Sequence, residues 1–136
     1  MSGERKKVIC IEDNATNMLL VSRIVEVEGH DLLPAEDGHS AIKLLNGCDP
    51  DIVLLDINIP GISGLDLARM IRQSPRLASV PVIATTANVL VGDRERCIEA
   101  GCDDYLPKPL DIRKLREMLR HYLENGRPPN GAAAHS

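Results

Sequence analysis

Short apolar runs alternate with longer amphipathic segments along most of this chain. The clearest short run is Asp-Ile-Val-Leu-Leu at 51–55, which is typical of a buried strand. The longer segments carry apolar residues three or four positions apart, which is helical spacing. The pattern predicts strands over 8–11, 32–35, 51–55, 80–85 and 104–106. It predicts helices over 15–28, 39–46, 65–73, 89–100 and 111–124.

Five strand–helix pairs in strict alternation predict an α/β fold, in which helices cover both faces of a parallel sheet. We expect one domain over 6–124, followed by a disordered tail or linker over 125–136, where Gly, Pro and Ala show no periodicity. The helix predicted at 89–100 has a poor apolar stripe and an internal glycine, Gly92. We therefore expect this helix to shift easily.

The composition narrows the class of protein further. Tyr105 and Tyr122 are the only aromatic residues, and the net charge is -4. The apolar content is too high for a disordered chain, and no stretch approaches the ~20 apolar residues that span a bilayer. Few aromatic rings and an acidic balance argue against nucleic-acid binding. We expect neither a membrane nor a nucleic acid as partner.

The cysteines and histidines form no recognisable zinc pattern. Cys10, Cys48, Cys97 and Cys102 include no pair with CxxC spacing, and the four histidines are scattered. We interpret both sets as core or surface residues. The first apolar run is too short for the core of a signal peptide, so we expect a cytoplasmic protein with reduced thiols.

Polar side chains follow four of the predicted strands: Glu12, Asp13, Asp56, Thr86 and Lys108. In an open parallel sheet, ligands bind at the carboxyl ends of the strands, so these residues are candidates for one site. Three carboxylates at one edge raise each other's pKa values unless a cation joins them. Oxygen ligands favour Mg²⁺, and a carboxylate can act as nucleophile toward phosphorus. The residues therefore indicate a magnesium site with capacity for phosphoryl chemistry.

The chain resembles the receiver domains of bacterial two-component response regulators. The matching stretches are Ile11-Glu12-Asp13-Asn14, Leu55-Asp56-Ile57-Asn58-Ile59-Pro60-Gly61, Ala84-Thr85-Thr86-Ala87-Asn88 and Asp104-Tyr105-Leu106-Pro107-Lys108-Pro109. Each stretch alone is a weak signal, but the ordered set is specific and covers about residues 6 to 124. These sequence motifs are most similar to those of DivK-type and hybrid-kinase receivers. The resemblance implies the flavodoxin-like, CheY-like fold, a doubly wound five-stranded parallel sheet in the order 2-1-3-4-5 with five helices.

The resemblance also implies a role for each matching residue. Asp56 is then the phosphoryl acceptor, and Mg²⁺ is held by Glu12, Asp13, Asp56 and the backbone carbonyl of Asn58. Thr86 is expected to donate a hydrogen bond to the phosphoryl group, and Lys108 to pair with its charge.

Two further features follow from the same family pattern. Tyr105 is expected to act with Thr86 as a switch that alters the face formed by the fourth helix, the fifth strand and the fifth helix. A half-buried packing role for Tyr105 is the alternative. The Lys108–Pro109 peptide bond is expected to be cis.

Two positions depart from the family pattern. Glu12 stands where Asp is commoner in the family. We expect this change to shift the ion, with a water molecule between the ion and Glu12. Thr85 stands where the family usually carries an aliphatic residue, and the sequence suggests no consequence.

Our leading hypothesis is that the chain is a single-domain response regulator and not an enzyme that turns over a substrate. Its expected partners are a histidine kinase or histidine phosphotransfer protein as donor and a downstream protein target. A receiver excised from a hybrid kinase is one alternative. A Mg²⁺-dependent phosphatase with an aspartyl-phosphate intermediate is another, but the DxD pair and cap insertion of such enzymes are missing here. A purely metal-binding module ranks last, because it leaves Thr86 and Lys108 unexplained.

Overall fold

The computed structural model describes residues 4–87 and 92–127, which form five strands and five helices in alternation. The strands are β1 (Lys7–Ile11), β2 (Asp31–Ala35), β3 (Ile52–Asp56), β4 (Val82–Thr86) and β5 (Asp104–Pro107). The helices are α1 (Ala15–Val27), α2 (Gly38–Gly47), α3 (Gly64–Gln73), α4 (Asp93–Glu99) and α5 (Ile112–Asn125). The predicted elements are therefore all present, with bounds that shift by a few residues.

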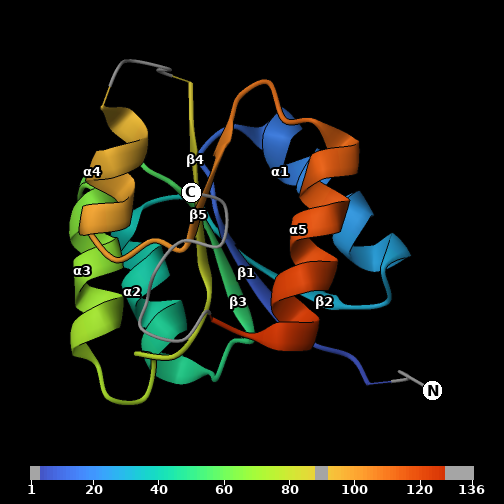
Figure 1. The fold of residues 1–136 in the computed structure, drawn as a ribbon, viewed down its shortest axis with the longest axis horizontal. Helices are drawn as coiled ribbons and strands as arrows, with labels where there is room; N and C mark the ends of the chain where they lie inside the picture. The colour runs from blue at the N-terminus through green and yellow to red at the C-terminus, as the bar shows by residue number, and fades with distance from the viewer. Residues whose placement is uncertain (1–3, 88–91, 128–136) are drawn as a thin grey trace.

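The strands form one parallel sheet in the order β2-β1-β3-β4-β5, as predicted. Helices α1 and α5 cover one face of this sheet, and α2, α3 and α4 cover the other (Figure 1). Because both faces are covered, the central strands β3 and β4 are buried along their whole length.

The core lies in two layers, one on each face of the sheet. Alternate residues of β3 point in opposite directions, so Val53 and Leu55 join the layer under α2, α3 and α4. Ile52 and Leu54 join the layer under α1 and α5. Burying an aliphatic side chain of this size stabilises the fold by ~1.5–3 kcal/mol. Aliphatic packing on both faces explains how the chain folds with only two aromatic residues.

One aromatic residue is part of this core. Tyr122 on α5 is buried, and its hydroxyl donates a 2.9 Å hydrogen bond to Asp104 Oδ2 at the start of β5. This hydrogen bond joins α5 to the sheet, and Tyr122 is part of the core.

Helix α4 differs from the sequence prediction at its start. Gly92 is the N-cap of α4, with a φ of 93°, and does not lie inside the helix. The prediction of an internal glycine was therefore wrong, because a left-handed residue precedes the helix instead of weakening its interior. Residues 89–91 of the predicted helix lie outside the described residues.

The C-terminal boundary of the domain also lies later than expected. Helix α5 includes Asn125, and Arg127 Nε donates a 2.7 Å hydrogen bond to Asp103 Oδ1. Asp103 is fully buried and also accepts from Arg72 on α3 and from the backbone N–H of Val82. The first residues of the predicted tail are thus part of the fold, and 128–136 lie outside the described residues.

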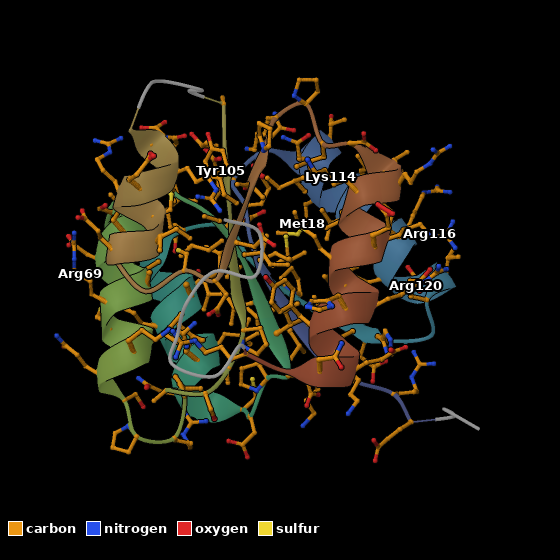
Figure 2. The ribbon with its side chains drawn as sticks, in the orientation of Figure 1. Met18, Arg69, Tyr105, Lys114, Arg116 and Arg120 are labelled. Carbon is orange, nitrogen blue, oxygen red and sulfur yellow. The ribbon has the colours of Figure 1, made fainter. Side chains whose placement is uncertain are left out.

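Ion pairs also join α5 to α1. Glu28, the C-cap of α1, accepts hydrogen bonds from Arg116 and Arg120 of α5. Both arginines are labelled in Figure 2. Within the described part of the chain, no helix is long and apolar enough to cross a membrane.

Candidate functional site

The carboxyl ends of the strands bring the five candidate residues to one edge of the sheet. Glu12 and Asp13 follow β1, Asp56 ends β3, Thr86 ends β4, and Lys108 follows β5. The strands are parallel and adjacent, so these ends meet. The sequence prediction that polar residues gather at this edge is met by the fold.

Lys108 lies between two buried carboxylates. Its Nζ is 2.9 Å from Glu12 Oε1 and 2.9 Å from Asp56 Oδ2. The backbone N–H of Lys108 donates to the carbonyl of Thr86 at 2.8 Å, which fixes the start of the loop. The Lys108–Pro109 bond is cis, as the family pattern implied.

Backbone N–H groups donate hydrogen bonds to the same two carboxylates, those of Glu12 and Asp56. The N–H of Asn14 donates to Glu12 Oε2 at 3.0 Å, and the N–H of Asn58 donates to Asp56 Oδ1 at 2.8 Å. Each donor lies two residues after the acid that it binds, so the turn after each strand sets the orientation of its carboxylate.

A third acid, Asp13, completes the cluster. One ligand oxygen from each of Glu12, Asp13 and Asp56 lies within 4.8 Å of the others. Glu12 and Asp56 are 3% and 2% exposed, whereas Asp13 is exposed to solvent. The cluster is therefore buried on one side and open to water on the other.

The charges at this edge do not balance. Burial raises the pKa of Glu12 above its ordinary value, although the hydrogen bonds from Lys108 and Asn14 act against this, and the nearby Asp56 raises it further. Burial alone lowers the pKa of Lys108, but its hydrogen bonds to Glu12 and Asp56 outweigh that effect and leave it raised. One ammonium faces three carboxylates, so the site has room for further positive charge.

The donor set fits a hard divalent cation. All three acids offer oxygen, and Mg²⁺ is bound through one or two carboxylates together with several waters. The exposure of Asp13 leaves an open side for such waters. The chemistry of the residues present is thus compatible with Mg²⁺.

Thr86 is buried beside the cluster and contacts Asn58. Its hydroxyl donates a 3.0 Å hydrogen bond to Asn58 Oδ1. Sequence reasoning assigned only the backbone carbonyl of Asn58 and missed this side-chain contact. The signal available was the amide itself, two residues after Asp56, which pairs with Thr85, the residue before Thr86, on the neighbouring strand.

Gly64 is a second residue that sequence reasoning missed. A Cβ at this position would lie 2.4 Å from Ile57 Cα and 2.8 Å from the carbonyl oxygen of Asp56. The first residue of α3 therefore packs directly against the end of β3, and only glycine allows this approach.

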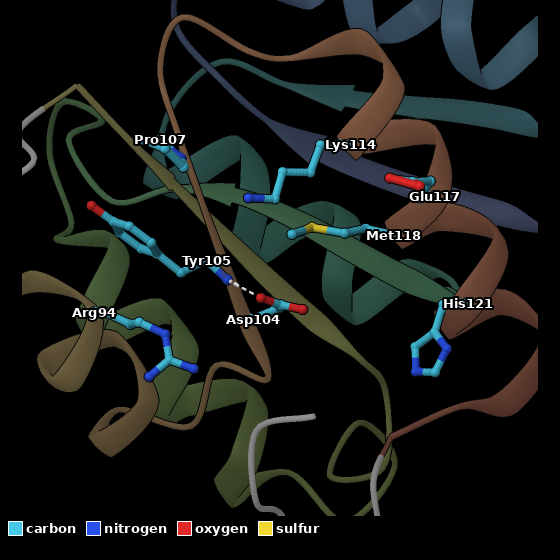
Figure 3. Close-up of a pocket in the computed structure, with 8 residues that line it drawn as sticks. All are labelled: Arg94, Asp104, Tyr105, Pro107, Lys114, Glu117, Met118 and His121. Atoms are coloured by element: carbon cyan, nitrogen blue, oxygen red, sulfur yellow. Dashed lines mark hydrogen bonds between the residues drawn. The ribbon is translucent and has the colours of Figure 1, made fainter. Parts of the chain in front are cut away.

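Tyr105 lies apart from the acidic cluster, on β5. Its side chain is half-buried and lines a groove with residues of α4 and α5 (Figure 3). Burial raises the pKa of its hydroxyl, and the charge of Asp93 on α4 adds to this.

Comparison with known proteins gives a consistent result. The sequence matches the family model of the response regulator receiver domain over residues 8–120. The polar-differentiation response regulator DivK of Brucella ovis is 35% identical over 118 residues, covering 87% of this chain and 96% of DivK.

Solved structures agree with this result. The receiver domain of a sensor histidine kinase from Pseudomonas aeruginosa PAO1 has a TM-score of 0.82 and 31% identity, covering 90% of this chain and 100% of that one. Its structure has a magnesium ion coordinated in the active-site cleft. The chemotaxis response regulator CheY4 of Vibrio cholerae, at 20% identity and a TM-score of 0.82 over 87% of this chain and 98% of its own, shares the fold.

The family model, DivK and the solved structures all point to the same family, and the solved structures share the fold. This chain belongs to the family of response regulator receiver domains.

Proposed function

We propose that Asp56 accepts a phosphoryl group and that the chain acts as a phosphorylation-controlled response regulator. The observation that carries this proposal is the pair of contacts on the Asp56 carboxylate, from Lys108 Nζ to Oδ2 and from the Asn58 N–H to Oδ1. A carboxylate held in this way, at the end of a central strand, is oriented for attack.

The transfer itself exchanges one bond at phosphorus for another. An oxygen of Asp56 forms the new P–O bond, and the P–N bond to the donor histidine breaks. The leaving imidazole nitrogen keeps that electron pair. Since phosphoryl transfer depends mainly on positioning and charge stabilisation, Asp56 needs no general base.

The neighbouring residues neutralise the charge that arrives. Lys108 already contacts Asp56 and is placed to pair with a phosphoryl oxygen. Glu12, Asp13, Asp56 and the Asn58 carbonyl would hold Mg²⁺, which neutralises phosphoryl charge when bound. These assignments are supported by the donor set and by the magnesium-bound receiver of the Pseudomonas kinase.

Thr86 is the proposed detector of phosphorylation. Its hydroxyl now donates to Asn58 Oδ1, and a phosphoryl group on Asp56 would offer a charged acceptor in its place. Movement of Thr86 toward that acceptor would make space for Tyr105. We propose that this couples the site to the face formed by α4, β5 and α5.

We propose that a protein partner contacts this face. A groove of about 560 Å³ runs along it, lined by Arg94, Asp104, Tyr105, Pro107, Lys114, Glu117, Met118 and His121 (Figure 3). Among the described residues, Asp93 Oδ2 on α4 is a buried side-chain oxygen with no hydrogen-bond partner. A buried oxygen without a partner destabilises this arrangement of α4. We propose that α4 rearranges readily for this reason.

The proposed partners are a histidine kinase or histidine phosphotransfer protein and a downstream protein target. DivK, a response regulator matched over 96% of its length, supports a single-domain regulator of the same kind. A cytoplasmic site of action belongs to this proposal.

Phosphotransfer from histidine donors tests this proposal. Donor kinases and phosphotransfer proteins from the host, labelled with ³²P on histidine, are each mixed with the chain and Mg²⁺. We expect rapid transfer from one donor to the wild type and to Asp66→Asn, which alters an exposed acid of α3. We expect no transfer to Asp56→Asn. Equal labelling of Asp56→Asn, or no labelling of the wild type by any donor, would contradict the proposal.

A further inference from the structure

Two of the four free cysteines meet where α4 ends. The N–H of Cys102 donates to the carbonyl of Cys97 at 3.0 Å, and the N–H of Gly101 donates to the carbonyl of Ile98 at 3.0 Å. Gly101 has a φ of 111°. These three features define a Schellman turn, in which the side chains of the first and last residues pack against each other.

The two thiols are enclosed together. Cys97 and Cys102 are 0% and 1% exposed and belong to the same core layer. A hydrogen bond from Cys102 lowers the pKa of the Cys97 thiol, and the same contact raises that of Cys102. The two sulfurs therefore lie close enough for each to alter the ionisation of the other.

A neighbouring arginine holds the turn in place. Arg72 Nε donates to the carbonyl of Gly101 at 2.7 Å, and its other nitrogens bind Val80, Ala78 and Asp103. Because the backbones of Cys97 and Cys102 share a direct hydrogen bond, their α-carbons are near enough for a disulfide, which spans ~4.4–6.8 Å. The turn therefore brings the two residues within the span of a disulfide.

The other two cysteines lie elsewhere. Cys10 packs in the layer under α1 and α5, on the opposite face of the sheet. Burial raises the pKa of its thiol to about 12. Cys48 is the half-buried C-cap of α2. Neither residue takes part in the Schellman turn.

We propose that Cys97 and Cys102 form a modification site, which low-molecular-weight disulfides convert into an intramolecular disulfide. The Cys97 thiolate attacks the external disulfide and releases one thiolate. The sulfur of Cys102, on losing its proton, then attacks Cys97 and releases the second. The chain gives up two electrons and two protons, and the external disulfide becomes two thiols.

The bond would fix the end of α4 to the start of β5. Helix α4 has only seven residues, so tying its last turn restricts much of the helix. Full burial of both sulfurs means that attack follows local opening of this turn. Modification of the half-buried Cys48 is therefore faster than closure of the Cys97–Cys102 bond.

Oxidised glutathione on the folded chain tests this site. Intact mass and peptide mapping follow the products. We expect a species with Cys97 linked to Cys102, which Cys10→Ser retains and which Cys97→Ser and Cys102→Ser both lack. Glutathione on Cys48 shows that the oxidant is active. If Cys48 is modified while Cys97 and Cys102 stay reduced, or if each carries its own glutathione, the proposal is wrong.

Hydrogen exchange separates a native modification from oxidation of unfolded chain. In the linked form, we expect amide exchange over 93–102 to slow several-fold while the amides of β1 and β3 keep their protection. Loss of protection throughout the sheet would show that the linked chain is not natively folded, which would overturn the proposal.

Discussion

At the scale of single residues, Lys108 is the group on which the acidic edge depends. Its ammonium is the cation that contacts both buried carboxylates, Glu12 and Asp56. The same contacts that stabilise the resting fold keep Asp56 oriented and provide positive charge for an incoming phosphoryl group. Stability and proposed function therefore rest on one side chain here.

Replacement of Lys108 tests how much its ammonium group stabilises the fold. Lys108→Met leaves Glu12 and Asp56 facing each other without a cation, and we expect the free energy of unfolding to fall by about 1–3 kcal/mol. Mg²⁺ should recover part of this loss, since it supplies the missing charge. Urea unfolding with and without Mg²⁺ measures both effects.

Lys114→Met is the matched control, because Lys114 is exposed on α5 and forms no ion pair with a described residue. It should leave the unfolding free energy within about 0.5 kcal/mol of wild type. If Lys108→Met is as stable as the wild type, the carboxylates need no cation from the protein.

At the scale of elements, the contact between α3 and β3 positions the site. A Cβ on Gly64 would press on the backbone of Ile57 and Asp56, and neither can move aside as a side chain can. We expect Gly64→Ala to lower the unfolding free energy by about 1–3 kcal/mol and to shift the loop that carries Asp56 and Asn58. Chemical denaturation and the amide chemical shifts of 56–58 measure this.

Gly47→Ala controls for the change of residue type. Gly47 ends α2, and a Cβ added there would meet only open space, so alanine should leave stability equal or slightly higher. Equal behaviour of the two variants would contradict the close packing of α3 against β3.

The pairing of α1 with α5 predicts a dependence on pH. The hydrogen bond from Arg120, aided by Arg116, outweighs burial and lowers the pKa of Glu28 below its ordinary 4.5. A lowered folded-state pKa means that the unfolded chain binds more protons, so this stabilisation is present above pH 4.5 and is lost as the pH falls through the folded-state value.

Glu28→Gln should remove that stabilisation. At pH 7, we expect a loss of about 1 kcal/mol, limited because both arginines are partly exposed to solvent. The difference from wild type should shrink as the pH drops below 4.5. Thermal unfolding across this range measures it, and a constant difference at every pH would contradict the ionic origin.

At the scale of the whole molecule, the fold could be predicted because the pattern of short and long apolar segments repeats through the chain. The buried run at 51–55 and the amphipathic segment at 111–124 leave little choice of element type. Strand alternation then brought Glu12, Asp56 and Lys108 to one edge, so most of the candidate site was predictable too.

The features that could not be predicted depend on contacts between distant residues. Nothing near Arg127 in the sequence indicates its ion pair with Asp103, which extends the domain past its expected boundary. The hydrogen bond between Thr86 and Asn58 likewise joins residues 28 positions apart. Nothing near Gly64 in the sequence indicates the close approach of β3, which is visible only in the folded chain.

The central claim is that Asp56 is the phosphoryl acceptor, and site mapping after reaction with a small acyl phosphate tests it most directly. With Mg²⁺ present, we expect the wild-type chain and Asp66→Asn to gain one phosphoryl group, mapped by peptide mass spectrometry to Asp56. Removal of Mg²⁺ should suppress the gain, and Asp56→Asn should abolish it. A phosphoryl group mapped to another residue of the wild type, or an undiminished gain in Asp56→Asn, would contradict the account.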